Sequence, residues 1–218
     1  MKTLTKMAMA AMTVTAMAAS TASADTVVVE RVHYRHRPGP RFMMPLEIDL
    51  GAVGADSSRG MAEGVQGSIG VHWASLSPTP TSWDAGIGIF GAIMGAGPAD
   101  NATDQMNQNN GIAYGGAYVQ VGHTLAQGNS WRTWLSGRGE YLASDAFGKS
   151  NTGLGVSARL SAELYSSGAG IEPGRGLFLG SYGVGVYVEA AMRDVAPGLS
   201  AFQATTGLTL RTPMAFGR

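Results

Sequence analysis

Charged residues recur at every second position in several stretches of the chain, among apolar or small neighbours. Glu47 and Asp49 are separated by one residue, and so are Arg138 and Glu140. A side-chain period of two places both members of such a pair on one face of an extended strand. In each such stretch the charged residues lie on the polar face of the expected strand. They are Glu47, Asp49, Asp84, Glu140, Glu163 and Glu189 with Arg132, Arg138, Arg159 and Arg211. Isolated buried charges are costly, so an enclosed face of this kind is expected to be an ion-paired network.

Two interpretations of this charged face remain open. The first is a structural network that fills a narrow lumen, and the second is a polar conduit for a small solute. If neighbouring strands pair and the sheet closes on itself, two sets of contacts follow. We expect Arg132 opposite Glu163, and Arg211 near Glu47 and Asp49.

Catalytic and ligand-binding chemistry is weakly supported. His72 and His123 have no acid or serine clearly placed beside them, so interior or interfacial histidines are expected rather than general bases. Residues 86–91 fit G-x-G-x-x-G, but they lie inside an expected strand and open no helix. Asp and Asn crowd residues 100–110 without the EF-hand spacing, which favours a solvated loop. We therefore expect no catalytic, cofactor-binding or metal-binding residues, and no enzymatic activity.

The elements that must position these charges are alternating strands. The clearest is TGLGVSARLSAELY, residues 152–165, with Leu, Val and Ala on one face and Gly, Ser, Arg and Glu on the other. Segments of about ten residues match a tilted membrane strand, and eight is a common number for a small closed barrel. The eight expected segments are 46–53, 65–75, 83–93, 112–124, 131–142, 152–165, 178–190 and 202–211.

Glycine and aromatic residues fit a barrel whose polar face points inward. The interior of eight strands is just wide enough for side chains to fill, so some of the 32 glycines would alternate there with large polar groups. On the apolar face of the expected strands, aromatic residues lie near the segment ends, as in the aromatic girdles of membrane barrels. This expected girdle contains Trp73, Trp83, Trp131, Tyr141, Phe178 and Phe202.

The connections provide a further expectation. With the N-terminus on the periplasmic side, odd-numbered connections face outside and should be the longer ones. Residues 54–64 and 94–111 are expected to be long loops, and residues 76–82 and 125–130 short turns. Residues 166–176 depart from this trend, because the segment is long where a short turn is expected.

Composition and the first residues indicate an exported chain. Charged residues make up 14% of the 218 residues, Lys+Arg and Asp+Glu balance at 15 each, and cysteine is absent. This balance gives no field that would attract nucleic acid, and the missing cysteine excludes a disulfide scaffold. Residues 1–24 have the basic, apolar and small-residue regions of a cleavable signal peptide. No later run is long and apolar enough for a transmembrane helix.

Residues 25–45 precede the alternating pattern. A short valine run is followed by a basic stretch with Arg31, Arg35 and Arg37, and Pro38-Gly39-Pro40 interrupts any regular element. We expect a flexible periplasmic arm, and the alternative is an arm that contacts an anionic cell wall or phospholipid headgroups.

We expect the barrel domain to comprise residues 46–218. Residues 46 to about 216 resemble the small eight-stranded outer-membrane barrels of the OmpA/OmpX type, on architecture rather than on a motif. The last strand keeps its apolar parity to Phe216, although Gly217 and Arg218 follow it and Pro213 interrupts it. The resemblance implies a single closed all-β, antiparallel, up-and-down transmembrane barrel in the outer membrane of a Gram-negative cell. The implied partners are outer-membrane lipid, lipopolysaccharide and the outer-membrane assembly machinery.

Three functions are compatible with this pattern. The expected one is a non-enzymatic barrel with a filled polar lumen that has a structural role or contacts surfaces through extracellular loops. The first alternative is a narrow channel for small solutes. The second is a soluble periplasmic barrel that binds a lipid-like ligand, with its apolar faces turned inward.

Overall fold

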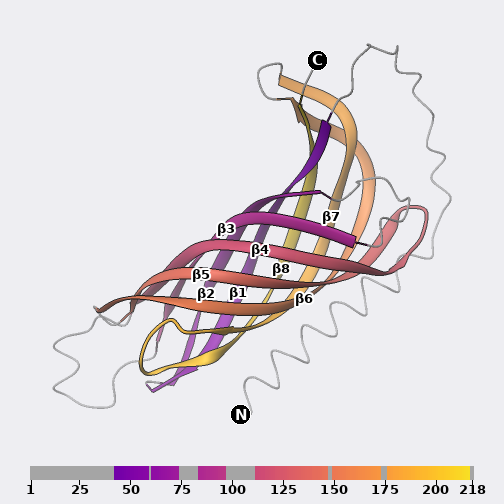
Figure 1. Cartoon of the computed structure of the whole chain (residues 1–218). Helices are drawn as coiled ribbons and strands as arrows, with labels where there is room; N and C mark the ends of the chain where they lie inside the picture. Colours follow the sequence, from indigo (N-terminus) through magenta and orange to yellow (C-terminus); the bar gives the residue numbers. More distant parts are fainter. Residues whose placement is uncertain are drawn as a thin grey trace.

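The structure, a computed structural model of the chain, describes residues 42–58, 60–73, 83–96, 111–146, 149–172 and 176–216. Its strands are β1 (Phe42–Ser57), β2 (Gly60–His72), β3 (Trp83–Gly95), β4 (Gly111–Gln127), β5 (Trp131–Ala146), β6 (Lys149–Glu172), β7 (Gly176–Arg193) and β8 (Leu199–Phe216). Each strand pairs with the next, and β8 pairs with β1, so that the sheet closes (Figure 1). The expected single eight-stranded antiparallel barrel is confirmed.

The barrel has two ends, a terminal end and a distal end. The terminal end is the one at which β1 begins and β8 ends, where Phe42 pairs with Phe216. The distal end carries the connections β1–β2, β3–β4, β5–β6 and β7–β8, because the strands run alternately up and down.

The alternation of side chains along each strand sets the two faces of the wall. In β6, Leu154, Val156 and Leu160 are exposed on the outer face, whereas Arg159 and Glu163 are buried inside. The other strands repeat this arrangement, with isoleucine, valine and leucine on the outer face. The barrel is therefore apolar outside and polar inside.

Several strands extend beyond the alternating segments. β6 has 24 residues where the pattern indicated residues 152–165, and β7 continues to Arg193. The added residues are mostly small or polar, so the alternation fades there, but backbone groups make the ladder hydrogen bonds whatever the side chain. β5 begins opposite Leu164, so the last part of β6 projects past its neighbour at the terminal end.

Two expected long loops are wrong. Residues 54–64 belong mainly to β1 and β2, which pair as far as Ser57 and Gly60. Gly60 has φ of 92°, a left-handed conformation that favours glycine in this tight turn. Residues 166–176 likewise lie mostly in β6 and β7. The expected loop 94–111 is shortened to the connection between Gly95 and Gly111, most of which lies outside the described residues.

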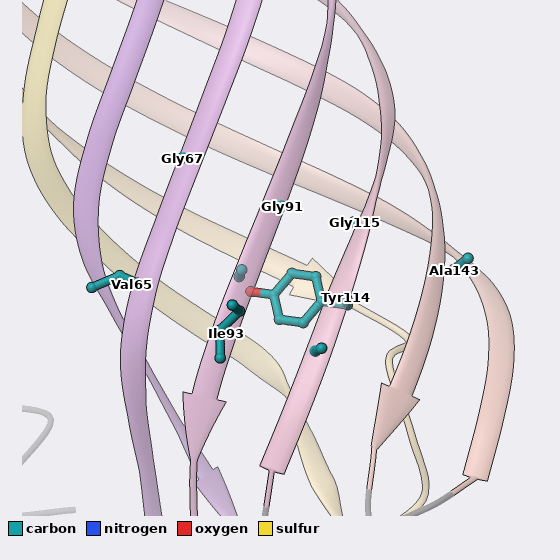
Figure 2. A pocket seen from close by; sticks show the side chains of 9 residues that line it. Val65, Gly67, Gly91, Ile93, Tyr114, Gly115 and Ala143 are labelled. Atoms are coloured by element: carbon teal, nitrogen blue, oxygen red, sulfur yellow. The ribbon is translucent and has the colours of Figure 1, made fainter.

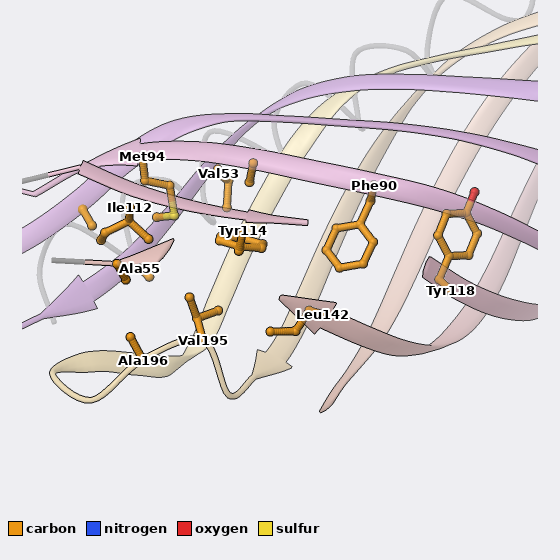
Figure 3. Close-up of a cluster of buried hydrophobic side chains, with 13 residues drawn as sticks. Val53, Ala55, Phe90, Met94, Ile112, Tyr114, Tyr118, Leu142, Val195 and Ala196 are labelled. Carbon is orange, nitrogen blue, oxygen red and sulfur yellow. The ribbon is translucent and has the colours of Figure 1, made fainter. Parts of the chain in front are cut away.

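The interior has two zones. Buried apolar side chains gather toward the distal end (Figure 3), and the cluster comprises Val53, Ala55, Ala62, Phe90, Ala92, Met94, Ile112, Tyr114, Tyr118, Leu142, Ala146, Val195 and Ala196. Buried charged side chains occupy the remaining length. Within the residues that the structure describes, no helix is long and apolar enough to span a membrane. The same part of the chain contains no group of His, Cys, Asp or Glu side chains arranged to hold a metal ion.

Inward-facing glycines leave room for the large interior side chains. Gly70 and Gly88 pair with each other, and the phenol of Tyr118 lies over both of them. The indole of Trp134 covers Gly122 in the same way. A side chain at any of these glycines would occupy the space that the aromatic ring fills. The glycine content therefore has a packing reason in the narrow lumen.

Candidate functional site: the ionic interior of the barrel

The ten charged residues singled out by alternation all lie inside the barrel. Each is buried, with at most 5% of its surface exposed, and together they are Glu47, Asp49, Asp84, Arg132, Arg138, Glu140, Arg159, Glu163, Glu189 and Arg211. They come from β1, β3, β5, β6, β7 and β8. Distant parts of the chain therefore meet in one enclosed network.

Arg159 is the centre of this network. Its guanidinium donates to both carboxylate oxygens of Asp49, at 2.6 and 2.7 Å, and to Glu47 at 3.2 Å. The ring of Tyr187 covers the guanidinium, with 3.9 Å from Cζ to the ring centroid. Arg138 approaches the same two carboxylates at 3.2 Å each. Two arginines and two acids therefore form a compact, fully enclosed group whose charges are paired.

A second group lies nearer the terminal end. Arg211 pairs with Glu47, with Asp84 at 3.2 Å and with Glu163 at 3.0 Å. Arg132 lies directly opposite Glu163 in the ladder and donates to it at 3.2 Å. No contact of Arg211 with Asp49 is found among the described side chains, because Arg159 and Arg138 hold that carboxylate.

Trp134 belongs to the same group. Its inward position keeps the alternation of β5, but it is a large aromatic residue among polar and charged neighbours on that face. Its indole Nε1 donates to Glu163 at 2.9 Å, and the guanidinium of Arg211 lies 4.0 Å from its ring centroid. The residue thus fills space, satisfies a carboxylate and covers a cation at once.

Arg193 is the interior cation that alternation did not identify. It donates to Glu140 at 2.6 and 2.8 Å and to Glu189 at 2.7 Å, and it also reaches the side chains of Gln66 and Gln203. The expected seventh segment stopped at residue 190, three residues short. Extending the odd-numbered parity from Glu189 to residue 193 would have included it.

His72 is enclosed by carboxylates. Its Nδ1 lies 3.4 Å from Asp84 and its Nε2 lies 3.7 Å from Glu47, so the expectation of no neighbouring acid is wrong for this residue. The expectation failed because both acids are on other strands, Asp84 on β3 and Glu47 on β1, which are the two neighbours of β2 in the sheet. His72 has no exposed surface. His123 is elsewhere, against Trp83 on the outer wall, with ring centroids 4.9 Å apart.

The expected aromatic girdle falls on the outer wall where its side chains are described. Trp83 and Trp131 begin β3 and β5, and Trp73 follows β2, so these three lie at the terminal end. Phe202, near the start of β8, lies toward the distal end, and Tyr141 is in the distal half of β5. Trp73, Trp83, Tyr141 and Phe202 are exposed, and Trp131 is half-buried. The side chain of Phe178 is outside the described ones.

The outer wall has one described hollow, of about 450 Å³ (Figure 2). It lies over β2 to β5, where Gly67, Gly91, Gly115 and Ala143 are opposite one another on successive strands. These residues, with Val65 and Ile93 and neighbouring alanines and Tyr114, make up its lining. The hollow is thus a depression in the apolar surface rather than an entrance to the charged interior.

The arrangement as a whole defines a class of protein. An apolar outer wall around a closed, ion-paired interior is the fold of a small outer-membrane β-barrel. A soluble barrel with a lipid-binding interior requires the opposite orientation, with apolar faces inside. The exposed Ile93 and Leu208 and the buried Arg159 contradict that alternative.

Comparison with known proteins supports the class and shows the fold alone. The crystal structure of Neisserial surface protein A is similar, with a TM-score of 0.53 and 8% sequence identity over 78% of this chain and 96% of that one. An outer membrane channel from Pseudomonas putida F1 aligns with a TM-score of only 0.26, at 9% identity over 86% of this chain and all of that one. No protein-family model and no curated protein sequence matches the chain.

Proposed function

We propose that this protein is a non-enzymatic integral outer-membrane barrel with a filled lumen, which acts as a rigid mount whose distal end contacts surfaces or partners. The main support is the enclosed ion-pair network centred on Arg159, surrounded by an apolar wall. A lumen occupied by paired side chains stabilises a narrow barrel and leaves little bore for a solute. The connections at the distal end are then the parts available for contact with other molecules.

The proposal includes the partners and the route to the membrane. The exposed aliphatic wall suits outer-membrane lipid and lipopolysaccharide, and the apolar parity of β8 suits the assembly machinery. Residues 1–24 would direct export and be removed. Arg31, Arg35 and Arg37 would touch an anionic cell wall or headgroups. Residues 1–41 lie outside the described part of the chain, so these statements rest on the sequence.

Cell fractionation tests the location. The mature protein is expected in the outer-membrane fraction, to need detergent for extraction, and to migrate differently on gels before and after heating, because closed barrels resist unfolding by detergent. A mature protein that remains monomeric in buffer without detergent would contradict the membrane assignment.

Planar-bilayer recording tests the filled lumen. The wild-type protein is expected to give no steady openings, because side chains from all eight strands occupy the bore. A matched variant with Arg138 and Arg159 both changed to serine removes the two central guanidiniums and shows whether an emptied lumen is detectable. Steady openings from the wild-type protein would instead favour the narrow channel.

A further inference from the structure

The connection between β7 and β8, residues 194–198, folds into the distal end of the barrel. Val195 and Ala196 are 1% and 7% exposed and pack in the apolar cluster (Figure 3). Asp194, Pro197 and Gly198 on either side of them are exposed. This segment therefore covers the apolar zone with two small side chains directed inward.

Among the residues that the structure describes, few polar contacts hold this segment, and one of them is local, from the backbone N–H of Leu199 to the carbonyl oxygen of Ala196 at 3.2 Å. Ser144 Oγ donates to the carbonyl oxygen of Val195 at 2.6 Å, and the side-chain amide of Asn151 approaches the same oxygen at 3.5 Å. The backbone N–H of Ser58 donates to the carbonyl of Gly198 at 2.7 Å. The backbone N–H of Asp194 donates to Leu154 at 3.2 Å. These contacts are local to the distal end, and none of them involves the ion-pair network.

The apolar zone below the segment borders the ionic one, because Phe90 and Tyr118 at its inner edge lie against the guanidiniums of Arg193 and Arg138. Val53, Met94, Ile112 and Leu142 belong to the same buried apolar cluster as Val195 and Ala196. The ionic zone begins one layer further in, where Arg193 lies 5.2 Å from the ring centroid of Phe90. Withdrawal of residues 194–198 would therefore uncover this packed apolar zone, which we call the apolar chamber, without breaking any of the charged contacts.

We propose that residues 194–198 form a lid that opens and closes this chamber while the rest of the barrel stays folded. Gly198 has φ of +88°, a conformation that glycine adopts without strain, and it joins the lid to β8. On the other side the lid joins Arg193, which Glu140 and Glu189 hold in place. The lid thus moves between two fixed strand ends. Local opening of this kind needs far less disruption than global unfolding.

Thiol accessibility tests the lid, because the chain has no cysteine of its own. One reporter variant is Ala55→Cys, in the chamber, and the second is Thr209→Cys, in the ionic zone; both side chains are at most 1% exposed. With a charged thiol reagent and protein in detergent micelles, the thiol at position 55 is expected to react at least about tenfold faster, since only it is uncovered by lid opening. Equal rates at both positions would overturn the proposal, because global unfolding alone would then expose the chamber.

A second substitution weakens the lid. Ser144→Ala removes the hydrogen bond to Val195 and is expected to raise the rate at position 55 by roughly threefold to tenfold, with no change at position 209. Ser136→Ala is the matched control, because Ser136 is also a buried, inward-facing serine of β5 but its hydroxyl has no hydrogen-bond partner among the described residues. Equal effects of the two substitutions would also count against the lid.

A disulfide provides an independent measurement that needs no reporter. A Cβ at Gly198 would lie 3.8 Å from the Cβ of Ser58, within the range of disulfide bonds, although the φ of +88° strains any residue with a side chain at position 198. The oxidised and reduced forms of one variant are therefore compared, because both carry this strain. In the Ser58→Cys/Gly198→Cys variant, oxidation is expected to slow amide hydrogen exchange of residues 194–199 at least about tenfold, and reduction to restore it. Exchange in residues 194–199 of the wild-type protein that is as slow as in the central strands would contradict local opening whether or not the variants fold.

Discussion

Each central guanidinium of the interior has carboxylates at its edge and an aromatic ring on its face. Arg138 lies 4.3 Å from the ring centroid of Tyr118, Arg159 lies 3.9 Å from that of Tyr187, and Arg211 lies 4.0 Å from that of Trp134. Arginine suits such sites, because its planar group stacks and donates hydrogen bonds in the same plane. The interior is thus ordered by geometry as well as by charge.

Arg159→Met is the sharpest test of the network at the level of one residue. Methionine keeps much of the volume but leaves Asp49 and Glu47 short of a partner, and removing one member of a buried ion pair typically costs about 3–5 kcal/mol. Urea unfolding of the protein in lipid vesicles measures the loss. Lys149→Met is the control, because Lys149 is an exposed cation on the same strand. An equal and small effect of both substitutions would mean that the network contributes little to stability.

The hydrogen bond between Trp134 and Glu163 can be isolated by a double-mutant cycle. Trp134→Phe removes the indole donor and Glu163→Gln removes the charge of the acceptor. A hydrogen bond to a charged group contributes about 1.5–3 kcal/mol, so the unfolding free energies of the single and double variants should show coupling of roughly that size. Additive effects would show that the two residues act separately.

At this scale the sequence identified most, but not all, of the interior. Strict alternation found ten charged residues that the structure encloses. It did not include Arg193, because the surrounding residues 190–193 are alanine, alanine, methionine and arginine and gave no clear boundary. Alternation also did not place Asp84 beside His72. Contacts between strands depend on the pairing register, which the period-two pattern of a single sequence does not determine.

At the scale of elements, glycines on the two faces of one strand have opposite roles. Gly88 faces inward, and a Cβ there would lie 2.5 Å from both the Tyr118 phenol and the carbonyl oxygen of Ile69. Gly91 faces outward, and its nearest neighbour would be 3.8 Å away. The same chemical change thus has different consequences three residues apart.

Gly88→Ala is therefore expected to destabilise the barrel by about 1–3 kcal/mol, because overpacking forces neighbouring groups to move. Gly91→Ala is the matched control in the same strand and should leave stability nearly unchanged. Urea titrations of both variants compare them directly. If Gly91→Ala were the more harmful substitution, the assignment of faces in β3 would be incorrect.

The existence and order of the strands followed from period two, whereas their ends did not. β1 and β2 continue through Gly54, Ala55 and Ala62, which are too small to show an apolar face, so the sequence indicated a loop there. The same holds for residues 166–176 in β6 and β7. Backbone pairing extends through such residues without a side-chain signal, which is why strand ends were the least predictable part of the fold.

At the scale of the whole molecule, the environment of the outer wall decides between a membrane barrel and a soluble one. Leu208 in the middle of β8 is 63% exposed, so in water a charge there would be harmless. In a bilayer, an arginine near the midplane costs about 2–4 kcal/mol. Leu208→Arg should therefore reduce the unfolding free energy in lipid vesicles by about that amount.

Glu63→Arg is the control for this experiment, because Glu63 is exposed near the distal end of β2, where charge is tolerated. Its effect in vesicles should be small, since the cost of a charge on the outer wall falls toward the interface. If Leu208→Arg were as well tolerated as Glu63→Arg, the band around Leu208 would not face lipid.

The way in which Arg211 is held restricts the order of assembly. Its partners are on β1, β3 and β6, and Glu47 is opposite it across the β1–β8 seam, where the first and last strands pair and close the sheet. Until β1 and β8 pair, the guanidinium of Arg211 and several carboxylates lie in an incomplete sheet without all of their ion-pair partners. A partly inserted chain would thus carry uncompensated charge at membrane depth. Insertion of the strands into the membrane and closure of the sheet should therefore be close to simultaneous, and the pairing of β8 with β1 should complete both.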